Sequence, residues 1–278
     1  MHRFLKFVIG CGGVYVSFMG YGVMQEKLYK SHYPTYNDEH NLEKFTFGFG
    51  IQIIQSFLAI IMGFILTRGE PEVPEKQQMG QIDQAKMGLF GCVSMLGSNY
   101  ALSYVSYPVQ ALFKSCKVLS VLLVGLLFGK TKYRFLQYLT GILVTLGVFG
   151  FNFMNSKSGG NTQILGLVLL MISLLSDGLM AEEQNSARSK FNLSSFRMML
   201  YSNKYTFLIS LAYSILTQQL PLLLDFLYLR PSALPDLFLA GLLGAIGLPF
   251  IFYTIKHFGP ANLAIITTTR KLFTVFWV

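Results

Sequence analysis

The chain has 278 residues, of which 53% are hydrophobic, 15% aromatic and only 13% charged. An ordinary soluble domain carries roughly 25% charged residues, so this composition excludes a water-facing surface of mixed charges. It predicts an all-α polytopic membrane protein that lies in a lipid bilayer. The net charge of +9 comes from basic residues scattered between apolar runs. This distribution does not predict a nucleic-acid-binding patch.

Apolar stretches of about 20 residues, the length that crosses a bilayer, define the predicted membrane spans. The nine spans cover residues 4–25, 45–67, 87–104, 107–129, 135–154, 164–181, 198–218, 233–255 and 260–278. Pro108 and Pro260 mark two tight joins, between the third and fourth spans and between the eighth and ninth. Residues 26–44 and 69–86 are polar and are expected to form connecting loops. We therefore expect one membrane domain over residues 1–278 and no soluble domain.

The first segment has two interpretations. Its basic opening, Met1 to Lys6, is followed by apolar residues and so resembles a signal peptide. The apolar run is long, however, and no small-residue cleavage site ends it. We therefore expect a first span that is retained in the protein.

The orientation in the membrane is predicted from the loop lysines and arginines, which favour the cytosolic side. With a cytosolic N-terminus, five basic residues fall on the lumenal side: Lys27, Lys30, Lys44, Lys157 and Arg230. Twelve fall on the cytosolic side: Arg3, Lys6, Arg68, Lys76, Lys86, Lys130, Lys132, Arg134, Arg188, Lys190, Arg197 and Lys256. This excess predicts a cytosolic N-terminus.

Five further basic residues lie within predicted spans: Lys114, Lys117, Lys204, Arg270 and Lys271. A cation at the bilayer centre costs about 2.5–3.5 kcal/mol even on a lenient insertion scale, so such residues need a reason to be there. Lys204 is near the start of its span, and we expect it to extend to the interface. The other four occur as two pairs, which favours a function.

The two pairs sit in similar polar stripes. In the fourth span, Tyr107, Gln110, Lys114 and Lys117 share one helical face. In the ninth span, Thr267, Arg270, Lys271 and Thr274 do the same. Each stripe follows a turn that is marked by a proline, so the two halves of the chain look like copies, and matching polar features in two halves indicate a transporter's substrate site.

The spacing of the stripes predicts that the two copies are inverted. The fourth and ninth spans are five spans apart, and an odd number gives the two repeats opposite topology in the membrane. Repeat one covers about residues 1–155 and repeat two about residues 160–278. The two cation pairs would then meet near the midplane.

Four converging cations need anions. An anionic substrate can supply them, and phosphate suits a cluster of lysine and arginine. We therefore expect a cavity for a phosphorylated solute, with Glu26 at the lumenal end of the first span as one of the few acidic residues nearby. The alternative is that each cation extends to an interface or pairs with Asp177 in the sixth span.

Four runs of residues carry a resemblance to a known family. They are YGVMQEKLY (21–29), SNYALSYVSYPVQALFKSCK (98–117), RMMLYSNKY (197–205) and FIFYTIKHFGPANLAIITTTRKLFT (250–274). The chain resembles the nucleotide-sugar transporters of solute carrier family 35, subfamily B, over essentially its whole length. The resemblance implies the drug/metabolite-transporter fold, with ten helices in two inverted five-helix repeats. It also implies that Lys114, Lys117, Arg270 and Lys271 bind phosphate.

The chain departs from the family at three places. Val118, Leu119 and Ser120 stand where the family usually has Pro-Ile-Pro, which predicts that a helix kink is missing. A family glutamine is replaced around Leu248 and Pro249. The sequence also ends at Val278 within the ninth span, so we expect the tenth helix to be missing.

The leading functional hypothesis is an antiporter that moves UDP-galactose or UDP-glucose in exchange for a nucleotide. The resemblance implies the endoplasmic reticulum membrane first and the Golgi membrane second. An ATP/ADP exchanger fits the same charges, and a truncated, non-transporting paralogue is a remote alternative. A membrane-embedded enzyme is disfavoured because the four histidines (His2, His32, His40 and His257) lie in loops or at span ends. We expect no catalytic residue, metal site or cofactor, and the sequence leaves the oligomeric state open.

Overall fold

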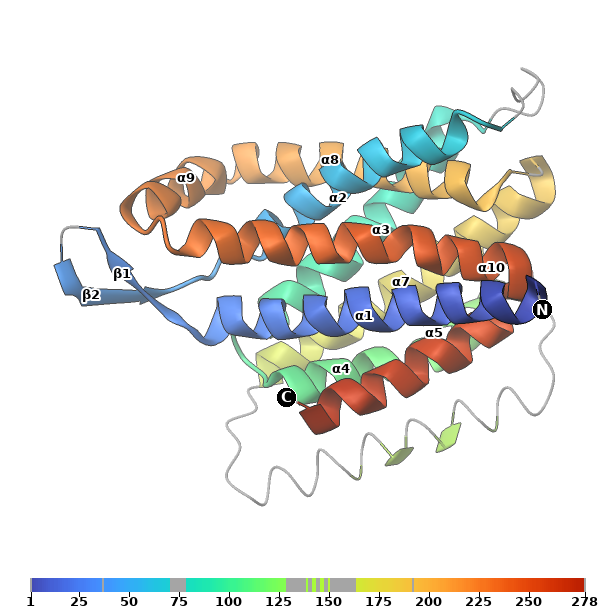
Figure 1. Cartoon of the computed structure of the whole chain (residues 1–278), viewed down its shortest axis with the longest axis horizontal. Coiled ribbons are helices and arrows are strands. Elements are labelled where there is room, and N and C mark those ends of the chain that lie inside the picture. The colour runs from blue at the N-terminus through green and yellow to red at the C-terminus, as the bar shows by residue number, and fades with distance from the viewer. Residues whose placement is uncertain are drawn as a thin grey trace.

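The computed structural model describes residues 2–36, 38–70, 79–128, 164–191 and 193–277, together with isolated residues between 139 and 150. Most of these residues form helices that lie side by side in one bundle (Figure 1). The helices are α1 (His2–Lys30), α2 (Gly48–Thr67), α3 (Gln81–Ala101), α4 (Tyr107–Ser115), α5 (Lys117–Phe128), α7 (Ile164–Phe191), α8 (Ser195–Leu216), α9 (Gln219–Leu229) and α10 (Ala233–Trp277). The all-α class is thus confirmed, whereas the predicted span at 135–154 lies largely outside the described residues.

Several helices have the length and hydropathy of a membrane span. Within the described residues, four helical segments qualify: Phe4–Lys30, Gly48–Thr67, Ile164–Arg188 and Ala233–Phe258. A fifth is formed if α8 and α9 are taken together as one bent span. The large apolar side chains that remain exposed on these helices, such as Phe64 and Ile65 of α2, are those that would face lipid.

The connection between the first two spans is more ordered than predicted. α1 continues to Lys30, and residues His32–Thr35 (β1) and Asp38–Lys44 (β2) then pair as an antiparallel hairpin. The backbone N–H of Tyr36 donates to the carbonyl of Leu229, which ties the hairpin to the end of α9. The prediction of a plain loop was therefore wrong here, because a short pair of strands satisfies its own backbone groups outside the membrane.

The fourth predicted span is broken. α4 ends at Ser115 and α5 begins at Lys117, with Cys116 between them in a turn whose N–H donates to the carbonyl of Phe113. The prediction of an uninterrupted helix was wrong, because a tight turn interrupts the helix although no proline is present. The break gives the two lysines separate helices, with Lys114 near the end of α4 and Lys117 at the start of α5.

The second half of the chain differs from the prediction at two joins. α8 and α9 meet at an angle of 87°, next to Gln218, which has a left-handed backbone with φ of 54°. No helix was predicted from the sequence where α9 lies. α10 is one helical stretch of 45 residues that includes Pro260. At about 1.5 Å per residue it is far longer than a bilayer is thick, and Figure 1 shows it turning back near the N-terminal end of α1.

The halves of the chain pack against each other throughout the bundle. α1 packs on α10, while α3, α4 and α5 pack on α7; α2 packs on α8 and α10, and α3 also packs on α8. The glycines of α10 allow close packing. A Cβ atom at Gly241, Gly244 or Gly247 would lie 2.5, 2.8 or 2.4 Å from side chains of Ile54, Gln55 and Phe18.

Candidate functional site

Three charged side chains meet inside the bundle. The Nζ of Lys114 donates to Asp177 Oδ2 at 2.8 Å, and the Nζ of Lys117 lies 3.5 Å from Asp177 Oδ1. The Lys114 side chain is 21% exposed and that of Asp177 12%, whereas Lys117 is 47% exposed. One carboxylate thus contacts both lysines of the fourth predicted span, and the pairing with Asp177 that the sequence analysis weighed as the alternative is present.

Asp177 reaches the lysines because α7 lies very close to α3 and α5. Ser173 donates to the backbone carbonyl of Ser94 at 2.5 Å, and Ser120 donates to the carbonyl of Leu174 at 2.5 Å. Next to Asp177, a Cβ at Gly178 would lie 2.9 Å from the backbone oxygen of Ser120. Small residues at these positions let the backbones approach, which is the usual way in which membrane helices pack.

The other polar residues of α4 also contact neighbouring helices. Pro108 lies in the first turn of α4, where a proline costs no helical hydrogen bond. The Gln110 amide donates to the carbonyl and the hydroxyl of Ser98, each at 2.9 Å. Lys114 also donates to Ser94 Oγ at 2.8 Å. Gln110 and Lys114 of the predicted stripe therefore lie against two serines one turn apart on α3, whereas Lys117 lies beyond the break, on α5.

The second cation pair lies on the returning arm of α10. The Nη1 of Arg270 donates to the carbonyl of Phe18 at 2.9 Å, and the guanidinium lies 5.4 Å from the centre of the Phe18 ring. Arg270 also interacts with the hydroxyl of Tyr107, the first residue of α4. Thr267 donates to the carbonyl of Leu263 in its own helix, at 2.9 Å. The side chain of Lys271 lies outside the described residues.

α4 therefore links the two groups of cations. Tyr107 at one end of its polar stripe interacts with Arg270, and Lys114 near the other end contacts Asp177. Seven helical residues separate Tyr107 from Lys114, which corresponds to about 10 Å along the axis. Tyr107 is also close enough to Glu26 for an electrostatic interaction, while Glu26 itself forms an ion pair with Lys30 one turn along α1.

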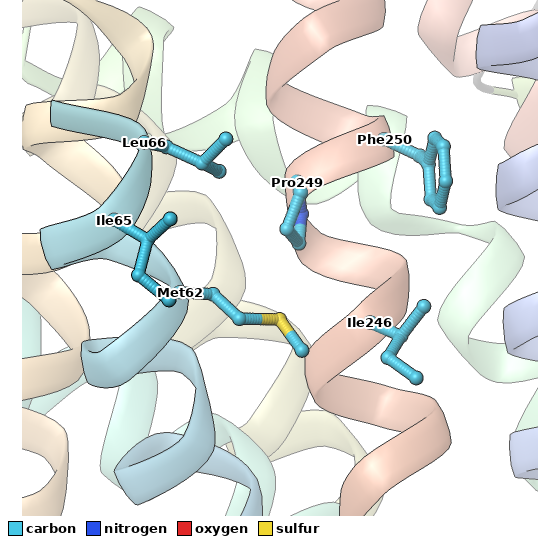
Figure 2. A pocket seen from close by; sticks show the side chains of 6 residues that line it. All are labelled: Met62, Ile65, Leu66, Ile246, Pro249 and Phe250. Carbon is cyan, nitrogen blue, oxygen red and sulfur yellow. The ribbon is translucent and has the colours of Figure 1, made fainter. Parts of the chain in front are cut away.

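One pocket in the structure lies away from these charges. It has a volume of about 260 Å³, and Figure 2 shows its lining between α2 and α10. The lining residues are Met62, Ile65, Leu66, Ile246, Pro249 and Phe250, all of them apolar. Such a lining offers no hydrogen-bond partner to a phosphate group, so this pocket is not the expected substrate cavity.

Several residues that hold the cations in place were not predicted from the sequence. Ser94 and Ser98 of α3 are four residues apart in an apolar span, and this spacing could have identified them as a polar face. Phe18, which contacts Arg270, gave no such signal, because its carbonyl and its ring are features that any aromatic residue in a span possesses. Tyr15 donates to Thr269 at 2.6 Å and was likewise not identified.

Comparison with known proteins gives one consistent family. The model of the UAA transporter family matches residues 6–277. Similar proteins include solute carrier family 35 member B1 of Xenopus tropicalis, which is 34% identical over 273 residues, 95% of this chain and 81% of the frog protein. The protein of that name from Gallus gallus is 35% identical over 266 residues, covering 95% of this chain and 81% of its own length.

A more distant relative extends the comparison beyond vertebrates. Solute carrier family 35 member B1 of Dictyostelium discoideum is 31% identical over 285 residues, covering 98% of this chain and 69% of its own length. The match is therefore continuous and includes both groups of cations. The chain belongs to the UAA transporter family, and it is a multi-pass membrane solute transporter rather than an enzyme.

Proposed function

We propose that the chain is a nucleotide-sugar/nucleotide antiporter, which moves UDP-galactose or UDP-glucose across a membrane in exchange for a nucleotide. The observation that carries this proposal is the pair of lysines inside the bundle, one of which, Lys117, is 47% exposed. A transporter that holds two cations at membrane depth is suited to an anionic solute. Phosphate oxygens are well matched to lysine and arginine donors, and each of the two proposed UDP-sugars carries two phosphates.

In the proposed site, Lys114, Lys117, Arg270 and Lys271 bind the phosphates. Gln110, Tyr107, Thr267 and Glu26 line the same space and would contact the rest of the solute. The interaction of Tyr107 with Arg270, on a helix that also carries Lys114, supports the placement of both groups along one path. The two ends of this stripe are roughly 10 Å apart, so a solute that contacts both groups of cations would extend along α4.

Two inverted repeats supply the movement in this proposal. α2 runs from the hairpin end of the bundle to Glu70, which accepts a hydrogen bond from Ser194 just after α7. α7 therefore ends where α1 begins, so the first helices of the two halves run in opposite directions. The helix contacts of the two halves also correspond. α1, the first helix of the first half, packs on α10 of the second half, and α7, the first helix of the second half, packs on α3, α4 and α5 of the first half. Rocking of two such repeats would expose one site to each side in turn.

Exchange is favoured over one-way transport because a return without substrate leaves cations in the membrane with fewer counter-charges. The proposed location is the endoplasmic reticulum membrane, with the Golgi membrane second. The basic residues of the described loops support a cytosolic N-terminus. Figure 1 places the hairpin and α9 at one end and the N-terminus at the other, and the end with the N-terminus also holds Arg68, Arg188 and Arg197.

The test is counterflow in proteoliposomes that contain the purified chain. One set of vesicles is loaded with UMP and another with ADP, and labelled UDP-glucose, UDP-galactose and ATP are offered outside. We expect UDP-sugar to enter the UMP-loaded vesicles. Entry of ATP into the ADP-loaded vesicles alone would instead identify an ATP/ADP exchanger, which the same cations could serve. No uptake under any loading would contradict both functions.

Variants connect the uptake to the site. Lys117→Ala and Arg270→Ala should each abolish exchange, because each removes a proposed phosphate ligand. Lys204→Ala is the matched control, since Lys204 is an exposed cation on α8 that lies over the ring of its neighbour Tyr205 at 5.5 Å. The control should exchange at the rate of the unmodified protein. Equal loss in all three variants would show that the effect is not specific to the site.

A further inference from the structure

Asp177 uses the same hydrogen-bond donors that a phosphate would need. Its two carboxylate oxygens lie 2.8 Å from Lys114 Nζ and 3.5 Å from Lys117 Nζ. A carboxylate and a phosphate oxygen accept hydrogen bonds from an ammonium group in the same way. Two anions beside the same lysines also repel each other, so a phosphate bound there would weaken the contacts of the carboxylate with both lysines.

We propose that Asp177 is a resident counter-ion that competes with the substrate's phosphate for Lys114 and Lys117. This inference rests on the proposed function and adds a role for a residue of α7 in the transport cycle. While the carboxylate is in contact, it offsets the charge of the lysines inside the membrane. When a phosphate arrives, it takes over the lysines and the carboxylate is displaced.

The geometry assigns an order to this replacement. Lys117 is the more exposed of the two lysines and has the longer contact with Asp177, at 3.5 Å. Lys114 is more buried, contacts Asp177 at 2.8 Å and is also held by Ser94 Oγ at 2.8 Å. A phosphate would therefore contact Lys117 first and replace the carboxylate at Lys114 second.

The replacement would also change how the two halves of the chain are held together. Asp177 lies on α7, in the second half, and the lysines lie on α4 and α5, in the first half. Loss of these ion pairs would loosen α7 from α4 and α5 at the moment of binding. Substrate binding would in this way favour the movement of one half against the other, which is the coupling that a carrier needs.

A second consequence concerns return without substrate. Because Asp177 offsets lysine charge, the unmodified carrier should be able to change its orientation unloaded, at a slow rate. Without the carboxylate, that step would leave the two cations in the membrane without this counter-charge. Asp177 would therefore permit some one-way transport, which the two lysines without a counter-charge would prevent.

The experiment uses Asp177→Asn, which keeps the shape of the side chain and removes its charge. Binding is measured with pyrophosphate, which carries phosphate charge without a base or a sugar, and with UDP. We expect the dissociation constant for each to fall by about tenfold or more, because a competing charge within 4 Å has been removed. In proteoliposomes, uptake into vesicles without internal nucleotide should fall relative to uptake into UMP-loaded vesicles.

Asp236→Asn is the matched control. Asp236 is also a mostly buried carboxylate in a lysine pair, 2.7 Å from Lys27 Nζ, but it lies at the start of α10 at the hairpin end. Its loss should leave pyrophosphate binding and the ratio of the two uptakes unchanged. Asp177→Glu provides a second variant if the asparagine protein is unstable, and it should retain the ratio of the unmodified protein because it retains the charge.

The possible results separate the two proposals. Unchanged or weaker pyrophosphate binding by Asp177→Asn, in a protein that still exchanges nucleotides, would overturn the role of Asp177 and leave the proposed function intact. An altered uptake ratio in Asp177→Glu as large as that in Asp177→Asn would overturn the role as well. Failure of the unmodified protein to exchange any nucleotide, together with tighter pyrophosphate binding by Asp177→Asn, would remove the proposed function and support the competition.

Discussion

Lys114 lies in the first half of the chain and Arg270 in the second, and the structure holds them by different means. Lys114 donates to the carboxylate of Asp177 on α7. Arg270 donates to the backbone carbonyl of Phe18 on α1 and lies over the ring of the same residue. The first contact joins opposite charges, whereas the second joins a cation to neutral groups that orient it without cancelling its charge.

This difference indicates that the two cations have different tasks. A lysine whose partner is a carboxylate can exchange that partner for a phosphate, so its contact is replaceable. An arginine that is fixed by a backbone carbonyl and a ring keeps its position whether or not an anion is present. The lysine side is therefore suited to respond to the substrate, and the arginine side is suited to attract and orient it.

Lys114→Ala should have the largest effect, because it removes the cation whose contact with Asp177 a phosphate could replace. We expect at least about a hundredfold loss of exchange, since a phosphate ligand is lost and Asp177 loses the shorter of its two lysine contacts. Breaking a buried ion pair from one side typically costs about 3–5 kcal/mol of stability. Counterflow and thermal unfolding in detergent measure the two effects. Exchange at the normal rate would show that Lys114 has a purely structural role.

Gly178→Leu tests whether close helix packing places Asp177 at the lysines. A side chain there would collide with the backbone of Ser120, so α7 would move away from α5. Overpacking of this kind typically costs about 1–3 kcal/mol, and we expect a lower unfolding temperature together with weaker exchange. Gly12→Leu is the control, because a Cβ at Gly12 meets no atom within 4 Å. Equal destabilisation by both changes would contradict the packing argument.

Arg270→Lys tests whether the shape of the guanidinium matters in addition to its charge. The charge remains, but the planar guanidinium that contacts the carbonyl and the ring of Phe18 is lost. We expect the apparent KM for the nucleotide to rise by about tenfold, which corresponds to about 1.4 kcal/mol, with a smaller change in maximal rate. Initial rates of exchange at varied substrate concentration give both parameters. A lysine variant that behaves like the unmodified protein would show that charge alone is required.

Phe18→Leu should have the smallest effect of the four. It keeps the backbone carbonyl that accepts from Arg270 and removes only the ring. A cation–π contact contributes about 0.5–2 kcal/mol, depending on how well it is shielded from water. We therefore expect a few-fold rise in apparent KM, less than that of Arg270→Lys. A larger effect than that of Arg270→Lys would mean that the ring packs other parts of the bundle.

Much of the bundle could be predicted because hydropathy directly reports which segments lie in lipid. The spans that became α2 and α8 were found within a few residues of their ends, whereas α1 and α7 continue beyond the predicted ends, to Lys30 and Phe191, and α3 begins earlier, at Gln81. The hairpin and α9 were missed, because both lie at the end of the bundle, where polar and apolar residues mix. α9 is the clearest case, since Leu223 and Phe226 are buried against the hairpin side while neighbouring leucines are exposed.

The cations of the candidate site could be predicted from the sequence, whereas most of the groups that contact them could not. A lysine or an arginine in an apolar run is rare enough to be identified from one sequence. The pairing of Lys114 with Asp177 requires two helices that are far apart in the chain to approach. This approach depends on the close contacts of Gly178, Ser173 and Ser120. The contact of Arg270 with a backbone carbonyl leaves no trace in the sequence, because every residue has one.

The right-angled α9 also affects how the protein sits in membranes of different thickness. Its outer side chains, among them Tyr228 at 85% and Leu222 at 57% exposure, form an apolar and aromatic surface across the hairpin end of the bundle. If α9 lies along the membrane surface, it fixes the depth of that end. A thicker or thinner bilayer must then be accommodated at the opposite end, where long side chains such as Arg68 and Lys190 can extend toward water.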